Sequence, residues 1–185
     1  MIVYLHGFNS SPQSHKAQVL KRYMEKRGLG EEFACPALPV SARAAIGIIE
    51  DAAQGRGEAC YLGSSLGGFY ATYLVEKHGG KAVLVNPAIE PHVGLRAYLG
   101  PQKNLYTGEP YELTAGHLDE WRALYLSRIS PQRYLLLVET GDEVLDYRKA
   151  VARYAGAEQV VVPGGDHSLQ SFPTHLPRIL AFAGY

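Results

Sequence analysis

Two adjacent serines stand in a glycine-rich stretch, and the second has the spacing of a catalytic nucleophile. Residues 63–67 read GSSLG, which places Ser65 at the centre of a G-x-S-x-G pattern. The glycines of this pattern permit a sharp, strained turn from a strand into a helix, and the turn exposes the central hydroxyl. We therefore expect Ser65 to attack a carbonyl carbon, while Ser64 supports the turn by hydrogen bonding.

A serine hydroxyl is a weak nucleophile, so this chemistry needs a histidine base and an acid that orients the histidine. His167 lies in the stretch GGDHS, and Asp142 follows an apolar run in the stretch ETGDEVLDY. We expect His167 to be the base and Asp142 the acid, in the chain order serine, aspartate, histidine. Three nearby carboxylates are rivals for the role of the acid: Glu139, Glu143 and Asp146.

The oxyanion that forms in such an attack needs backbone N–H donors. One donor directly follows the nucleophile, at Leu66, where the next helix begins. The second is expected at Phe8, in the stretch LHGFN that ends the first apolar run. His6 and Gly7 are expected to support that loop, although a buried structural role is an open alternative for His6.

The elements that position these residues alternate between apolar runs and helical patterns. The apolar runs predict strands over residues 2–8, 31–39, 58–64, 81–87, 133–140 and 157–164. The helices predicted between them cover residues 11–28, 66–79, 115–128, 146–154 and 174–182, with one more that Ser41 can cap. Most strands are apolar throughout, so we expect an α/β fold of three layers, with helices on both faces of a mainly parallel sheet of about six strands. In such sheets functional side chains gather at the carboxyl ends of the strands.

One segment, residues 87–130, is too long for an ordinary connection and is rich in proline, glycine and tyrosine in its first half. Two interpretations stay open: a small lid or pocket wall, or a cluster packed on the sheet edge. In the first case the expected pocket residues of this segment are Tyr98, Leu99, Tyr106, Tyr111 and Trp121. Asn9, in the loop after the first strand, either lines the same pocket or forms a turn.

The composition excludes several classes of function. With 46% hydrophobic residues and a net charge of zero, the chain has no general attraction for nucleic acid or anionic membranes. Two cysteines without a C-x-x-C motif, and no histidines at ligand spacing, predict neither a disulfide framework nor a metal site. The glycine-rich stretch lacks the phosphate-binding spacings, so no cofactor is expected. The N-terminal apolar run is too short for a signal peptide or a membrane span, and we expect one cytoplasmic domain over residues 1–185.

Four stretches together resemble the small bacterial α/β-hydrolase esterases of the YqiA/YcfP-like type. They are YLHGFNSSP, YLGSSLGGFYATYL, TGDEVLDY and GGDHS, in this order over nearly the whole chain. The resemblance implies a compact α/β-hydrolase fold, a triad of Ser65, Asp142 and His167, and oxyanion donors at Phe8 and Leu66. It also implies that the substrate is a small-molecule acyl ester, or an acyl thioester.

Two alternatives to a serine esterase stay open. One is an acyl thioesterase for acyl-CoA-type substrates with the same triad, for which a basic phosphate site is expected near the pocket. The basic cluster over residues 15–27 is read instead as the solvated surface of a helix. The other alternative is a binding module with this fold and no turnover, which has no need for the complete catalytic set. The sequence does not indicate an oligomeric state.

Overall fold

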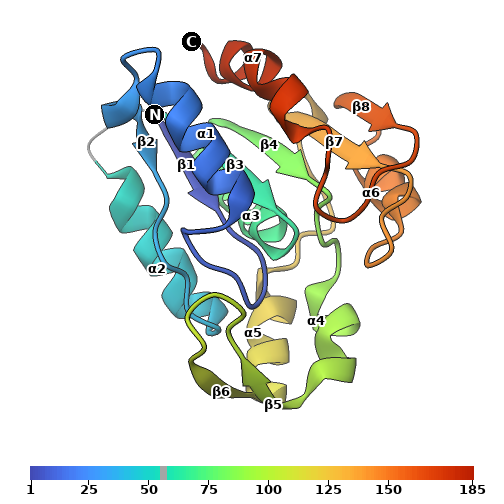
Figure 1. Cartoon of the computed structure of the whole chain (residues 1–185). Coiled ribbons are helices and arrows are strands. Elements are labelled where there is room, and N and C mark those ends of the chain that lie inside the picture. The colour runs from blue at the N-terminus through green and yellow to red at the C-terminus, as the bar shows by residue number, and fades with distance from the viewer. Residues whose placement is uncertain (55–57) are drawn as a thin grey trace.

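The computed structural model describes residues 1–54 and 58–185, and in these ranges six strands form one parallel sheet (Figure 1). The strand order is β2-β1-β3-β4-β7-β8. The strands are β1 (Ile2–Leu5), β2 (Phe33–Ala34), β3 (Cys60–Ser64), β4 (Lys81–Val85), β7 (Tyr134–Glu139) and β8 (Glu158–Val162). This confirms the predicted α/β sheet, and it places the first strand beside the strand that precedes Ser65.

Helices cover both faces of the sheet, which explains why its central strands are apolar throughout. Side chains alternate between the faces, so Ile2 and Val83 join one core cluster whereas Val3 and Leu84 join the other. The helices that pack on the Ile2 face are α1 (His15–Glu25) and α7 (Phe172–Ala183). Those that pack on the Val3 face are α2 (Ala42–Ala53), α3 (Leu66–His78), α5 (Ala115–Leu124) and α6 (Tyr147–Arg153).

Most predicted elements are shorter in the structure than the sequence pattern indicates, and the differences are largest for α1, β2 and α5. α1 begins later than expected, because residues 11–14 form a hydrogen-bonded turn. β2 has only two residues, since Pro36 and Pro39 follow it and have no N–H for a strand ladder. α5 ends at Leu124, where the backbone becomes extended.

The long segment between β4 and β7 contains elements that the sequence did not predict. They are α4 (Pro91–Gly94), a 3-10 turn η2 (Leu95–Tyr98) and the strands β5 (Gly100–Lys103) and β6 (Pro110–Leu113). β5 and β6 pair as an antiparallel hairpin, and with α4 and α5 they lie beyond the carboxyl ends of the sheet strands, in the lower part of Figure 1. That this segment acts as a lid stays a prediction.

Candidate active site

Ser65 occupies a strained turn between β3 and α3. Its backbone φ is 54°, a value that residues other than glycine rarely adopt. The Ser65 N–H donates to the Val85 carbonyl at 3.0 Å, which ties the turn to the neighbouring strand. A Cβ atom at Gly63 would lie 2.3 Å from the Gly67 carbonyl oxygen, so this approach of strand and helix requires glycine. Such strain and close packing are typical of a nucleophile elbow.

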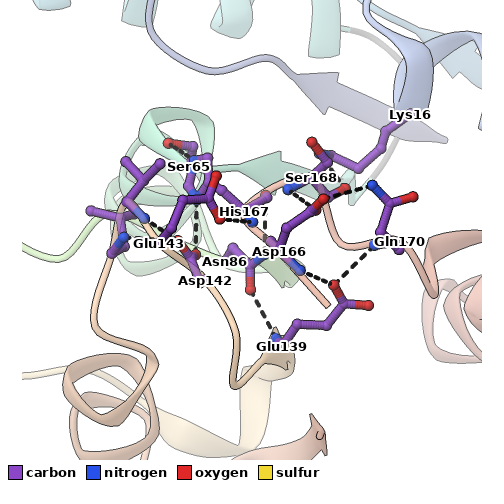
Figure 2. A network of polar contacts seen from close by, with 12 residues as sticks. Lys16, Ser65, Asn86, Glu139, Asp142, Glu143, Asp166, His167, Ser168 and Gln170 are labelled. Atoms are coloured by element: carbon purple, nitrogen blue, oxygen red, sulfur yellow. Dashed lines mark hydrogen bonds and ion pairs between the residues drawn. The ribbon is translucent and has the colours of Figure 1, made fainter. Parts of the chain in front are cut away.

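His167 lies between Ser65 and Asp142 and is hydrogen-bonded to both (Figure 2). Its Nε2 is 3.1 Å from Ser65 Oγ, and its Nδ1 is 2.8 Å from Asp142 Oδ2. The other Asp142 oxygen accepts hydrogen bonds from the amides of Val144 and Leu145. Burial alone would raise the pKa of Asp142, but the bonds from His167 and the two amides lower the pKa below its ordinary value. Asp142 is therefore a carboxylate that fixes the orientation of the imidazole.

The three rival carboxylates have other partners. Glu143 accepts the backbone N–H of His167 at 3.0 Å, and Asp146 accepts the N–H of Arg148 at 3.1 Å where α6 begins. Glu139 accepts four hydrogen bonds from the loop and turn after β8. Among the described residues, Asp142 is thus the carboxylate that is hydrogen-bonded to the His167 ring.

The loop after β1 lies directly beside Ser65. His6 is 4% exposed; its Nε2 accepts the Leu38 N–H at 3.0 Å, and its Nδ1 donates to the Gly7 carbonyl at 3.0 Å. Burial lowers the pKa of His6, so the imidazole is neutral and holds the loop rather than carrying charge. Within the described ranges, the N–H groups of Phe8 and Leu66 donate to no other residue. That these two groups bind an oxyanion stays a prediction.

A cavity of about 630 Å³ opens at Ser65 and His167. Its walls are largely apolar, and they come from the loop after β4, from α4 and η2, from the β5–β6 hairpin and from the loop after β7. The apolar lining residues include Ile89, Val93, Leu95, Leu105, Val144 and Leu145. The charged side chains in its lining are Glu90, Asp146 and Lys149.

The predicted pocket residues divide between this cavity and other places. Asn9 and Tyr98 line the cavity, as Phe8 and Leu66 do. Tyr111 instead lines a second cavity of about 230 Å³, which shares Phe8 and Asn9 with the first. The remaining three do not line the catalytic cavity: Leu99, Tyr106 and Trp121.

The reason differs among these three residues. Leu99 and Tyr106 are exposed at the surface, at 43% and 51% of their area. Trp121 is fully buried, because its position on α5 turns it into the core, where its Nε1 donates to the Tyr70 hydroxyl at 2.7 Å. The described residues contain no cluster of three His, Cys, Asp or Glu side chains that could hold a metal ion.

The profile of one protein family matches residues 1–184 of this chain. The chain belongs to the uncharacterised protein family UPF0227. Among solved structures, this UPF0227 chain is similar to a protein from Agrobacterium vitis S4, with 18% identity, a TM-score of 0.78, and 98% of this chain and 87% of that one covered.

Two further structures are similar to the UPF0227 chain. The mouse alpha/beta hydrolase domain-containing protein 10 has 15% identity, a TM-score of 0.73 and coverage of 97% and 87%. Est1E from Butyrivibrio proteoclasticus has 14% identity, a TM-score of 0.69 and coverage of 98% and 85%. These likenesses establish the α/β-hydrolase fold.

Within the ranges described for the UPF0227 chain, none of the helices has both the length and the apolar character that a bilayer crossing requires.

Two further residues, Asn86 and Glu139, hold the His167 loop (Figure 2). Sequence reasoning missed Asn86, and it considered Glu139 only as a rival for the acid. Asn86 directly follows β4 and is 3% exposed; its Nδ2 donates to the carbonyls of Asp166 and His167, both at 3.1 Å. Its Oδ1 accepts the Glu139 N–H at 3.1 Å. A polar residue in the Asn-Pro step after an apolar strand is the signal that could have identified Asn86.

Glu139 gives the site of the UPF0227 protein a pH-dependent contribution to stability. The side chain is 1% exposed; burial tends to raise its pKa, but hydrogen bonds from Ser171, Asp166 and Gln170 lower it below the ordinary value of 4.5. The stabilisation is therefore present above pH 4.5 and is lost as the pH falls through the lower pKa of the folded state.

We expect Glu139→Gln to lower the free energy of unfolding at pH 7 by about 1–3 kcal/mol, because the amide group faces N–H donors that lose an acceptor. The difference in unfolding free energy between the variant and wild type should shrink as the pH falls below about 4, because protonation of Glu139 then weakens its hydrogen bonds in the wild type as well. Urea unfolding between pH 3 and pH 8 measures this, with the exposed Glu158→Gln as the matched control. A difference that stays constant over this pH range would contradict the assignment.

Proposed function

We propose that this protein is a serine hydrolase that cleaves carboxylic esters through an acyl-enzyme intermediate. The observation that carries the proposal is the hydrogen-bonded chain from Ser65 through His167 to Asp142, at the end of a largely apolar cavity. The similarity to proteins described as an esterase domain from Rhodothermus marinus and as lipolytic enzymes supports this class of reaction.

The proposed reaction begins when His167 Nε2 takes the proton of Ser65 as Oγ bonds to the carbonyl carbon. The carbonyl oxygen becomes an oxyanion, which the N–H groups of Phe8 and Leu66 stabilise. The intermediate collapses, the C–O bond to the alcohol breaks, and the alcohol leaves with the proton from His167. His167 then deprotonates a water that attacks the acyl-enzyme, and the second collapse releases the acid and restores Ser65.

The walls of the cavity support an uncharged, apolar substrate. The volume of about 630 Å³ lies within the range of roughly 300–1,000 Å³ that is common for small-molecule sites. Lys149 is the cation in its lining, and Glu90 and Asp146 bring two negative charges to the same walls. A polyphosphate carrier such as coenzyme A would meet these carboxylates, so we favour an oxoester over acyl-CoA.

A chain-length series of p-nitrophenyl esters, combined with fluorophosphonate labelling and peptide mass spectrometry, tests the proposal. We expect turnover of the esters and covalent label on the peptide that contains Ser65, whereas urea-unfolded protein should not react. A faster reaction with acyl-CoA than with an oxoester of the same chain length would favour the thioesterase. No label and no turnover on any oxoester or thioester would contradict the proposal and favour the binding module.

A further inference from the structure

The loop that carries Phe8 is fastened to the β5–β6 hairpin by hydrogen bonds, and the two lie side by side in Figure 1. The Asn9 Oδ1 accepts the Tyr111 hydroxyl at 2.6 Å, and the Asn9 Nδ2 donates to Gln102 Oε1 at 3.2 Å. The Leu105 N–H donates to the Asn9 carbonyl at 3.0 Å. The Asn104 Nδ2 donates to the Ser10 carbonyl at 2.9 Å. The residues directly after Phe8 are therefore held by both side-chain and backbone contacts.

The Phe8 ring is enclosed by aromatic rings of the same long segment. Tyr98, Tyr111 and Trp121 each meet it edge to face, with ring centroids 6.2, 6.4 and 6.4 Å away. Edge-to-face pairs at such distances are favourable and directional. The segment between β4 and β7 thus fixes both the side chain of Phe8 and the chain that follows it.

Asn9 has a backbone φ of 54°, in the left-handed region that asparagine adopts more readily than most residues other than glycine. Its side-chain contacts to the hairpin support this turn. The Tyr111 hydroxyl is part of that support: burial raises the pKa of Tyr111 to about 12, so the group stays a protonated donor. Tyr111 does not line the catalytic cavity, and it contacts Asn9 and the Phe8 ring, which do.

We propose that Tyr111 and Asn9 are positioning residues, which hold the Phe8 N–H at the place where the oxyanion forms. The proposal rests on the proposed function, because the N–H of Phe8 matters only if an oxyanion forms at Ser65. The β5–β6 hairpin then positions an oxyanion donor, in addition to forming part of the pocket wall. A donor that is displaced by a fraction of an ångström stabilises the transition state less, while binding of the ground-state ester changes little.

Tyr111→Phe is the first test, because it removes one hydroxyl and keeps the ring that packs on Phe8. We expect kcat on a p-nitrophenyl ester to fall about 10-fold, with KM within about two-fold of wild type. The affinity for an alkyl trifluoromethyl ketone, which forms a tetrahedral adduct with the serine, should fall by the same factor as kcat/KM. Tyr73→Phe, the same change at a half-buried position on α3, is the matched control and should leave both values unchanged.

Asn9→Gly separates the effect of the side chain from that of the backbone. Glycine adopts a φ near 54° without strain, so this variant keeps the turn and removes only the contacts to Tyr111 and Gln102. We expect a loss of kcat at least as large as that of Tyr111→Phe. If both variants keep the wild-type kcat and inhibitor affinity, the proposal is wrong. It is also wrong if the loss of kcat is fully explained by a smaller fraction of folded protein. If wild-type Ser65 takes no fluorophosphonate label, the proposed function fails instead.

Discussion

Ser65→Ala is expected to lower kcat on p-nitrophenyl esters by at least about 10³-fold, while the fold and substrate binding remain. The Ser65 hydroxyl is the atom that bonds to the carbonyl carbon in the proposed reaction, and no other group takes its place. The oxyanion donors at Phe8 and Leu66 and the apolar cavity stay in the variant, so a small residual rate above that of water should persist.

Steady-state kinetics and a melting curve on the same preparation measure this effect. Ser64→Ala is the control, because it removes the neighbouring hydroxyl, which is 7% exposed and lies within β3. It should stay within a few-fold of the wild-type rate. The double variant Ser65→Ala/His167→Ala should be little slower than Ser65→Ala alone, since the two residues act as a unit. A fully active, folded Ser65→Ala protein would show that Ser65 is not the nucleophile.

The order of the motifs was enough to predict where the candidate catalytic residues gather. Ser65, Asp142 and His167 each follow a predicted strand, and the carboxyl ends of parallel strands meet at one edge of a sheet. The glycines around Ser65 also carry a signal, because the backbone packing at Gly63 and Gly67 excludes a side chain. The order of the six strands was not predicted, because the right-handed crossover rule sets the hand of each connection and not which strands are neighbours.

The sequence did not determine which of the nearby carboxylates contacts the His167 ring. Glu139 and Asp142 are three residues apart and have the same chemical group, yet one holds the loop after β8 and the other holds the His167 ring. That difference depends on the path of the backbone through the turn at residues 140–142 and on which amides each carboxylate faces. A sequence pattern gives neither of these quantities.

The same limit applies to the segment between β4 and β7. β5 and β6 have only four residues each and contain Pro101 and Pro110, which lower the strand propensity of the sequence. A hairpin outside the main sheet tolerates proline at positions that need no N–H for a ladder. The aromatic residues of the segment were predicted as pocket residues, but an aromatic ring can equally fill a core. Trp121 does so, because the face of α5 that it shares with Leu118 packs on the sheet side.

The second large effect is expected for Gly67→Ala, which should lower the free energy of unfolding by more than about 3 kcal/mol. A Cβ atom at Gly67 would lie 2.0 Å from the Leu5 carbonyl oxygen and 3.0 Å from the His6 carbonyl oxygen. Both contacts are to backbone atoms, so no side chain can move to relieve them. The start of α3 and the end of β1 would have to separate.

This separation should affect catalysis as well as stability, because β1 leads directly into the loop that carries Phe8. Protein that still folds should have a displaced oxyanion donor and a kcat lower by about 10²-fold or more. Gly47→Ala is the control: nothing lies within 4 Å of a Cβ at this position of α2, so we expect it to raise stability by about 0.5–1 kcal/mol. Urea unfolding and ester kinetics on both variants measure these effects. An unfolding midpoint and a kcat like those of wild type in Gly67→Ala would mean that α3 and β1 do not approach each other this closely.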